Sequence, residues 1–506
     1  MQFKHAHMTT TQDTDSITLE QVQDFKGKYP KQLWLLFLSE MWERFAFYGM
    51  RGMLTIFMVE QLKLTEKDAN LKYGAIQAFI YAMAFVGGLF ADKILGFRKS
   101  IFWGGFLMII GSFTLAFSPE HLYYIGICFT IVGTGFFKPN ISTMVGNLYK
   151  AGDHRRDAGF GVFYSGINIG ALLGGWLCIT VANNYSWNAA FSLAGIGMAI
   201  GLSIFIFTRR TLGPIGISPL SAKFSLSKIR MYDIMVYAGS LLVIPFILML
   251  IRNTSYTDMF MYIVGPAALL YIIFEMTKLD KAARQKMAAA LIFIIFSIFF
   301  WAFFEQAGGS LSLFARYNLH HDILGITFDP NAVNNSSNSL FVIILSPVFG
   351  LLWLWLSGRK MEPNTVIKFG LGFLFVSLAF YVFFYTRFFA DAAGLTSLNV
   401  FTLAYLVITF GELCLSPIGL SLMTKLAPQR LHGMMMGMWF LASAYGQYAA
   451  GIFGADMSLT NTHATLTDKL MAYTEGYKSL SLYALIAGIL LIVLSPLIRK
   501  LMHEVH

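Results

Sequence analysis

Hydrophobic residues recur along the chain in long runs, and short polar segments rich in charge separate these runs. A run of about 20 mostly apolar residues is long enough to cross a bilayer as a helix, and a helix satisfies its own backbone hydrogen bonds there. The pattern therefore predicts an all-α polytopic membrane protein with fourteen transmembrane helices. We expect these helices at residues 33–60, 70–92, 99–118, 122–149, 154–182, 188–208, 230–250, 259–279, 288–316, 334–358, 364–386, 398–426, 430–457 and 478–503.

The composition agrees with a membrane protein and indicates no bound metal or other cofactor. Of the 506 residues, 56% are hydrophobic and 13% are charged, whereas a soluble protein carries about 25% charged residues. The 3 cysteines lie in apolar runs and form no CxxC pair, so we expect neither a disulfide framework nor a zinc site. A membrane-embedded protease would need a nucleophile with its base or a metal motif such as HExxH, which the chain lacks, so we expect no enzyme.

The formal net charge of +10 does not indicate a nucleic-acid partner, because the basic residues follow the membrane topology. If the N-terminus is cytoplasmic, roughly three times as many of the 37 lysines and arginines lie on the cytoplasmic side as on the other side. This asymmetry is the positive-inside rule, and it predicts that both termini are cytoplasmic.

A segment rich in glycine, proline and serine, residues 211–227, is typical of a linker. The two spans after it carry no charge at mid-depth, so we interpret them as an inserted helical hairpin. Without this hairpin six spans remain before it and six after it, which is typical of a transporter with its site between two halves. We therefore expect a six-helix bundle at 33–208, the linker and hairpin at 209–287, and a second six-helix bundle at 288–503.

The first span carries four ionisable residues, and each of them costs about 2.5–3.5 kcal/mol at the centre of a membrane helix. At about 100° per residue, these residues share one helix face, beside Tyr48: Glu40, Glu43, Arg44 and Arg51. Such a face cannot contact lipid, so we expect it to line a water-filled cavity or to meet other charges. The alternative is an internal ion-pair cluster that only holds helices together.

The other ionisable residues at membrane depth are Lys138, Glu305 and Glu412, so the first half holds all the cations and the second half holds only carboxylates. Depths estimated at about 1.5 Å per residue match Arg51 with Glu305 and bring Lys138 near Glu412. Both pairs would cross between the halves. We expect these two salt bridges to act as gates for alternating access, with one forming at one end of the site while the other breaks at the opposite end. The alternative is permanent structural pairing.

Residues 40–51, EMWERFAFYGMR, resemble the signature of the proton-dependent oligopeptide transporter (POT/PTR) family. The loop at 87–99 resembles the cytoplasmic loop motif of the major facilitator superfamily, to which that family belongs. Further segments similar to family motifs are residues 133–147, 163–170, 301–306 and 411–417. The resemblance implies the major facilitator fold, with an inserted hairpin as in bacterial members.

The resemblance also implies a peptide-binding site and a set of proton-coupling residues. The peptide carboxylate would face Arg44, Arg51 and Lys138. The peptide amino group would face Asn168, Asn338 and Glu412. The side-chain pockets would be lined by Tyr48, Tyr81, Tyr164 and Trp439. Proton coupling would involve Glu40, Glu43, Arg44, Glu305 and Glu412.

The chemistry of these residue types agrees with that implication. A short peptide is a zwitterion, and a cation cluster in one half with carboxylates in the other half suits its two ends. Arginine binds carboxylates strongly and directionally. Proton coupling needs a carboxylate whose proton affinity changes when its salt bridge breaks.

We therefore predict a proton-coupled symporter of di- and tripeptides that works by alternating access in the inner membrane of a bacterium. Its partners would be the peptide, protons and the lipid bilayer, with no nucleic acid and no particular oligomeric state predicted. The alternative is proton-coupled transport of another small substrate, such as nitrate or an amino-acid conjugate, by the same fold.

Overall fold

The computed structural model describes residues 17–150, 152–415, 419–461 and 464–503, and these residues are almost entirely helical. The first helices are α1 (Leu19–Gln23), α2 (Lys31–Glu60), α3 (Glu66–Phe90), α4 (Phe97–Phe117), α5 (Pro119–Asn147), α6 (Arg155–Asn184) and α7 (Trp187–Thr208). They are followed by α8 (Leu226–Leu242), α9 (Ile244–Arg252) and α10 (Thr254–Thr277). The last helices are α11 (Lys281–Phe304), α12 (Ser310–Asn318), α13 (Pro330–Gly358), α14 (Thr365–Tyr385), α15 (Leu398–Leu415), α16 (Gly419–Leu426), α17 (His432–Met457) and α18 (Leu466–Met502). Two short strands, β1 (Asp322–Ile323) and β2 (Ile326–Thr327), pair antiparallel between α12 and α13.

Each of the predicted spans corresponds to one long helix or to a broken pair of helices. By length and apolar composition, 12 helices among the described residues could cross a membrane. The two predicted spans outside that group are α2 and α17, which have 30 and 26 residues and are therefore about 45 and 39 Å long. In α2 the ionisable residues lower the apolar content, so its length rather than its composition marks it as a span.

The span predicted at 230–250 is broken into α8 and α9. Pro245 lies in the first turn of α9, where its missing N–H group prevents an unbroken hydrogen-bond ladder from α8. The span predicted at 288–316 is broken as well, by a 3-10 turn over Glu305–Gly308 between α11 and α12. Glu305 therefore lies at a helix break, where the sequence pattern predicts a continuous helix.

The last span begins earlier than predicted, because α18 starts at Leu466 and not near residue 478. Thr465 and Asp468 form a capping box that marks this start. Charged residues in the first turns of α18 lower the local hydrophobicity, so the hydrophobic pattern does not show where this helix starts.

The span predicted at 398–426 consists of α15 and α16. Residues 416–418 between them, including part of the 411–417 motif, lie outside the described residues.

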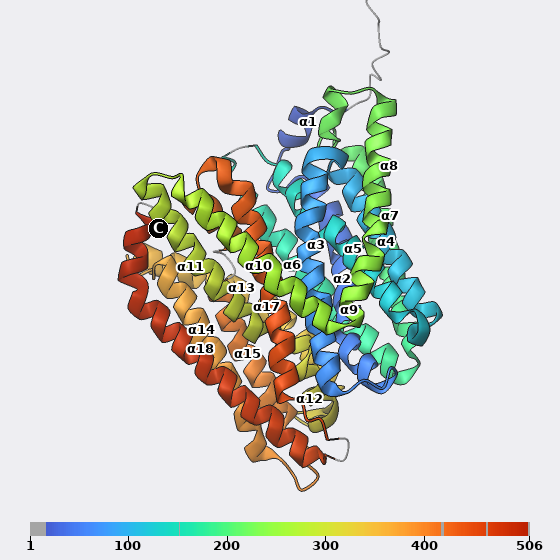
Figure 1. The fold of residues 1–506 in the computed structure, drawn as a ribbon, viewed down its shortest axis with the longest axis vertical. Coiled ribbons are helices and arrows are strands. Elements are labelled where there is room, and N and C mark those ends of the chain that lie inside the picture. The colour runs from blue at the N-terminus through green and yellow to red at the C-terminus, as the bar shows by residue number, and fades with distance from the viewer. Residues whose placement is uncertain (1–16, 151, 416–418, 462–463, 504–506) are drawn as a thin grey trace, which may run out of the picture.

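The long helices form two groups, which Figure 1 shows as blue-to-cyan and yellow-to-red ribbons. In the first helix group, α2–α7, α2 packs on α6 and α7, and α5 packs on α3 and α4. In the second helix group, α11–α18, α14 packs on α15 and α18, and α11 packs on α17. Each group has its own buried hydrophobic core. The two groups meet mainly where α3 contacts α17 and where α6 contacts α13.

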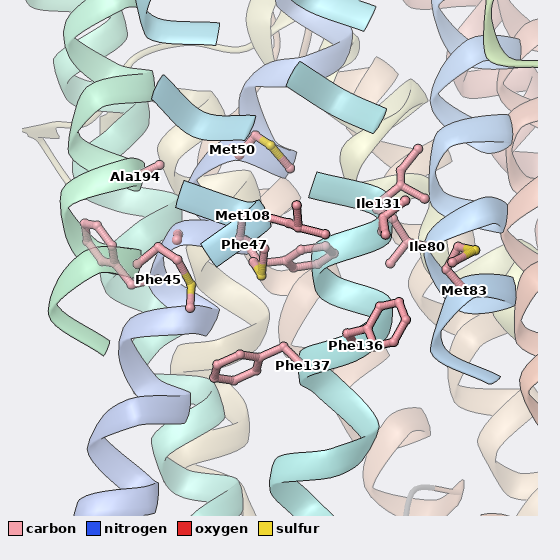
Figure 2. Packing of buried hydrophobic residues seen from close by; sticks show 14 of the residues in the cluster. Phe45, Phe47, Met50, Ile80, Met83, Met108, Ile131, Phe136, Phe137 and Ala194 are labelled. Carbon is pink, nitrogen blue, oxygen red and sulfur yellow. The ribbon is translucent and has the colours of Figure 1, made fainter. Parts of the chain in front are cut away.

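Figure 2 shows part of the core of the first helix group, in which Phe136 and Phe137 of α5 lie near Phe47 of α2 and Met108 of α4. All four side chains are at most 3% exposed. Within a bilayer, helices associate through close packing rather than through transfer out of water. This packing fixes α5 against α2 and α4, and it positions Lys138, which directly follows Phe137.

Two glycines allow the helix groups to approach each other closely. A Cβ atom on Gly74 of α3 would lie 2.7 Å from the Cα of Gly451 on α17, and one on Gly451 would lie 2.8 Å from the Cα of Gly74. No real side chain tolerates these distances to backbone atoms. The contact between α3 and α17 therefore depends on small residues, as is common in membrane helix packing.

The segment predicted as a linker packs closely on the first helix group. Leu212 and Ile215 are buried. The Arg98 Nε donates a hydrogen bond to the Ile215 carbonyl at 2.7 Å, and the Ser218 hydroxyl donates one to the Ile94 carbonyl at 2.5 Å. The segment is thus held against the start of α4.

The inserted hairpin, α8–α10, contacts both helix groups. On the first group, Lys99 of α4 forms an ion pair with Asp233 of α8 at 2.5 Å. On the second group, Tyr448 of α17 donates a hydrogen bond to Asp258 of α10 at 2.5 Å. Figure 1 shows α8 along the outer side of the first group and α10 running across towards the second.

Candidate functional site

A cavity of about 270 Å³ lies between the two helix groups. Most of the residues that the sequence nominates for the site line this cavity: Glu40, Arg44, Tyr48, Arg51, Tyr81, Lys138, Tyr164, Asn168, Glu305, Asn338 and Glu412. The first helix group supplies the cations, and the second supplies Glu305 and Glu412. The structure thus brings together residues that are more than 350 positions apart in the sequence, from Glu40 to Glu412.

On α2, Arg44 lies between two carboxylates at the wall of the cavity. Its Nε atom is 3.0 Å from Glu40 Oε1 and also forms an ion pair with Glu43 Oε2. All three side chains are at most 2% exposed. Glu43 does not line the cavity and lies behind Arg44 instead. One guanidinium therefore faces two buried carboxylates, an arrangement that is costly unless further charge or a proton balances it.

Arg51, two turns further along α2, crosses to the second helix group and forms an ion pair with Glu305. The Arg51 Nε also donates a hydrogen bond to the Tyr73 hydroxyl at 2.6 Å. This predicted contact is present, and the helix break after α11 makes room for it. A Cβ atom on Gly308 would lie 2.0 Å from the Tyr73 hydroxyl oxygen, so only glycine allows α3 to approach the break this closely.

Two more ion pairs join the helix groups near the C-terminal end of α2, which we call the Glu60 end of the molecule. Glu60 pairs with Arg316 of α12 at 2.7 Å. Glu66, at the start of α3, pairs with Lys469 of α18 at 2.5 Å. The sequence pattern did not predict either pair, because it places all four residues in loops or at span ends.

Lys138 of α5 makes no ion pair with Glu412 or with any other carboxylate in the described part of the chain. Its Nζ atom lies over the ring of Tyr81, 4.3 Å from the ring centroid, in a cation–π contact. The predicted pairing of Lys138 with Glu412 is therefore absent from this conformation. Among the described residues, every ion pair between the helix groups lies at the Glu60 end or at Arg51.

Glu412 of α15 is held by neutral hydrogen-bond donors. The Asn338 side-chain amide donates to Glu412 Oε2 at 2.9 Å, and the Tyr164 hydroxyl donates to Glu412 Oε1 at 3.3 Å. The Asn168 amide donates to the backbone carbonyl of Tyr164 at 3.0 Å. Among the described residues, no cation pairs with Glu412, so its carboxyl group can still bind one.

One nominated residue, Trp439 of α17, does not line the cavity and is 8% exposed within the core of the second helix group. Other residues that line the cavity were not nominated: Trp301, Asn334, Asn335 and Tyr405. The sequence carries a signal for two of them, because residues 334–339 are all amides or hydroxyls within an otherwise apolar span. Nothing in the sequence pattern distinguishes Tyr405 from the other tyrosines.

The cavity has no set of metal ligands. No cluster of three or more His, Cys, Asp or Glu side chains that could hold a metal ion occurs in the part of the chain that the structure describes.

Known proteins resemble this chain over almost its whole length. Residues 98–471 match the model of the POT family. The peptide transporter YePEPT of Yersinia enterocolitica is 34% identical over 508 residues, which cover 94% of this chain and 96% of that protein. The dipeptide and tripeptide permease B of Aeromonas hydrophila is 32% identical, and the match covers 94% of each protein.

Solved structures resemble it too. A crystal structure of a peptide transporter POT in complex with sulfate has a TM-score of 0.81 and 32% sequence identity, and the match covers 96% of this chain and 100% of that chain. This likeness confirms the predicted fold class, an all-α membrane protein of the major facilitator type. The chain belongs to the POT family, and it is a membrane transporter rather than an enzyme.

Proposed function

We propose that this protein carries di- and tripeptides across the inner membrane of a bacterium, in symport with protons. The observation that carries the proposal is the charge layout of one cavity. Arg44, Arg51 and Lys138 line it from the first helix group, and Glu412 with Asn338 lines it from the second. A ligand that fits this layout carries a negative charge at one end and a positive charge at the other.

Every short peptide has this charge distribution, whatever its own sequence, because its carboxyl end is negative and its amino end is positive. Lys138 has no carboxylate partner among the described residues, so it can bind the peptide carboxylate, with Arg44 close by on the same wall. Glu412 already accepts hydrogen bonds from Asn338 and Tyr164, and it can accept another from an ammonium group. The cavity volume of about 270 Å³ lies just below the usual range for ligand sites, about 300–1,000 Å³, so the cavity suits only a small ligand such as a short peptide.

Proton coupling is supported by the cluster of Glu40, Glu43 and Arg44. A single guanidinium balances only one of the two buried carboxylates, so a proton on the other would remove the remaining charge. Binding of a peptide carboxylate to Arg44 would draw the guanidinium away from these carboxylates. Proton binding and peptide binding therefore favour each other at this cluster.

We also propose that residues 33–208 and 288–503 move as two bodies around the cavity, with the hairpin in residues 209–287 spanning them. The ion pairs at Arg51, Glu60 and Glu66 support this, because all of them lie towards the Glu60 end. In the structure that end is closed. Opening it would break these pairs, and pairing of Lys138 with Glu412 would then close the other end.

The positive-inside rule supports an orientation in which both termini and the Lys31 end of α2 face the cytoplasm. The Glu60 end then faces the opposite side of the membrane. With the Glu60 end closed, the conformation described here is one that faces the cytoplasm.

A second candidate function, proton-coupled transport of another small anion or conjugate, uses only part of this layout. Nitrate has no group for Glu412 and Asn338. An amino-acid conjugate would use both ends but differs from a peptide in its separation of charges. Binding of dipeptides in which either the amino group or the carboxyl group is chemically blocked distinguishes a peptide carrier from a carrier of these other substrates.

The test measures binding of dialanine, N-acetyl-dialanine and dialanine amide to the purified protein. Loss of one charge-assisted contact in a partly desolvated site should cost about 1.5–3 kcal/mol, or roughly ten- to a hundredfold in affinity. Both blocked peptides should therefore bind more weakly than dialanine. Glu412→Gln should remove most of the discrimination against the N-acetylated peptide only, and Lys138→Ala should remove most of the discrimination against the amide only.

Each of these two variants serves as the control for the other, because each should affect one peptide end. Equal binding of free and N-acetylated dialanine to the wild-type protein would contradict the two-ended site. It would favour a cargo without an amino group.

A further inference from the structure

A second cavity lies where α4 begins, α7 ends and α8 passes alongside, and it shares no residue with the peptide site. It has a volume of about 440 Å³. Four of its lining residues are basic: Arg98, Lys99, Arg209 and Arg210. We call this cavity the basic pocket. A concentration of positive charge in a hollow between membrane helices requires a reason, because like charges repel each other.

Internal ion pairs use only part of this charge. Lys99 is paired with Asp233 at 2.5 Å. Arg98 donates from Nε and Nη2 to backbone carbonyls of the segment after α7, so its Nη1 group remains available. Arg209 and Arg210 are exposed, and neither has a hydrogen-bond or ion-pair partner for its side chain among the described residues. The pocket therefore keeps two whole guanidinium groups for a ligand.

The start of α4 adds to the positive potential. α4 has 21 residues, and its N-cap, Gly96, provides no side-chain hydrogen bond to the first turn. The amide end of a helix carries about half a positive charge, which favours an anion there. The Arg98 amide in this turn already donates to the Gly216 carbonyl at 3.0 Å, so the helix end adds positive potential while the side-chain cations supply the contacts.

The remaining wall of the basic pocket is aromatic, formed by Phe102, Phe205 and Tyr237. Phe102 is 39% exposed on the outer face of α4, within a helix that crosses the membrane. The pocket therefore joins a cationic part to an apolar surface that faces lipid. A soluble anion needs only the cationic part, whereas a lipid has a chemical group for each.

We propose that the basic pocket binds the phosphate group of an anionic phospholipid, with Arg209 and Arg210 as its main ligands and the aromatic wall against the upper part of an acyl chain. Arginine pairs with phosphate through two parallel hydrogen bonds, which gives this contact direction as well as strength. Basic pockets between membrane helices are a recognised means of binding lipid head groups. The bound lipid would join α4 and α7 of the first helix group to α8 of the hairpin.

The test measures retention of added phosphatidylglycerol or phosphatidylcholine by the detergent-purified protein, using native mass spectrometry over a range of lipid concentrations. The wild-type protein should retain phosphatidylglycerol in preference to phosphatidylcholine. The double variant Arg209→Gln/Arg210→Gln should need about 25 times more phosphatidylglycerol for the same occupancy, because each basic residue contributes about a factor of five near an anionic lipid. Neither arginine has a partner to lose, so the variant should fold.

The matched control is Lys223→Gln/Arg230→Gln, which removes the same charge from two exposed residues outside the basic pocket, one just before α8 and one near its start. It should retain phosphatidylglycerol as the wild-type protein does. Equal loss in both double variants, or equal retention of the two lipids by the wild-type protein, would overturn the proposal. The first result would show only general attraction of anions, and the second would show no preference for an anionic head group.

A second arm separates a lipid from free phosphate. Inorganic phosphate should not displace the retained phosphatidylglycerol any more than chloride of the same ionic strength does. Displacement by phosphate that is specific to the wild-type protein and absent in Arg209→Gln/Arg210→Gln would overturn the lipid assignment. It would show that the pocket is a site for soluble phosphate.

Discussion

The surroundings of Arg44 show which features of the site helical spacing predicts and which it does not. Helical spacing places Glu40, Glu43 and Arg44 on one face of α2, and the structure brings the three side chains into contact. The same spacing does not show that Glu43 lies behind the cavity wall. The angle around one helix says nothing about which neighbouring helix covers a residue. The polar run at 334–339 marks Asn334 and Asn335 as unusual, but only the position of α13 against the cavity shows that they line it.

We predict that Glu43→Gln abolishes proton-driven accumulation of peptide but leaves exchange of peptide across the membrane. The amide keeps the shape of the side chain but can no longer gain or lose a proton. Uptake of labelled dipeptide into proteoliposomes should fall below about a tenth of the wild-type level with a proton gradient. Counterflow, in which unlabelled dipeptide inside drives uptake of labelled dipeptide, should remain measurable.

Glu362→Gln provides the control for this variant. Glu362 is an exposed carboxylate that pairs with Lys368 between α13 and α14, outside the cavity. Its variant should show both activities at the wild-type level. Full accumulation by Glu43→Gln would remove Glu43 from the proton pathway.

At the scale of elements, hydrophobic runs predict where helices lie but not where they break. The hydrophobic runs at 230–250 and 288–316 each predict one continuous helix, yet the structure divides each into two helices. Proline explains the first break. The second break falls at the glycine pair Gly308–Gly309, and glycine weakens a helix. Gly308 also makes room for Tyr73 of α3, and a contact between segments so far apart in the sequence leaves no mark on local periodicity.

The close approach of α3 and α17 leads to a prediction about stability. Gly74→Ala places a methyl group within 2.7 Å of the Gly451 backbone, which cannot move aside as a flexible side chain would. Overpacking of this kind costs about 1–3 kcal/mol. The thermal unfolding midpoint of the purified protein in detergent should therefore fall.

Gly350→Ala is the matched control, because a Cβ atom at Gly350 of α13 meets nothing within 4 Å. Alanine is favoured over glycine in a helix by about 1 kcal/mol, so this variant should be neutral or slightly more stable. If the two variants unfolded at the same temperature, the tight contact between Gly74 and Gly451 would be refuted.

At the scale of the whole molecule, the sequence predicts the class of fold, the division at the hairpin and the residues that meet in the cavity. It does not predict the conformation. Lys138 and Glu412 lie at similar depth, yet they are not paired, whereas Arg51 and Glu305 are. A transporter must make different contacts in different states, so one sequence is compatible with both arrangements. The structure shows that the ion pairs between the helix groups, among the described residues, lie at Arg51 and at the Glu60 end.

The proposed orientation predicts opposite labelling at the two sides of the inserted hairpin. Ser227 and Ser255 are both exposed, and the long helices α8 and α9 separate them. With an impermeant maleimide, a cysteine that replaces Ser255 should react in intact cells. A cysteine that replaces Ser227 should react only after the membrane is opened.

The three natural cysteines are buried, so the unmodified protein should show little labelling and provides the background. Labelling at position 227 in intact cells would reverse the orientation. Such a result would place the closed Glu60 end on the cytoplasmic side.

The central claim is that a proton gradient drives a small peptide through the cavity between the helix groups. The most direct measurement is uptake of radiolabelled dialanine by the purified protein in proteoliposomes, with and without a pH gradient that is alkaline inside. We predict that dialanine accumulates inside above its external concentration only when the gradient is present, and that a protonophore abolishes this accumulation. Uptake that is unaffected by the gradient, or no uptake of dialanine by protein that exchanges another small solute, would contradict the account.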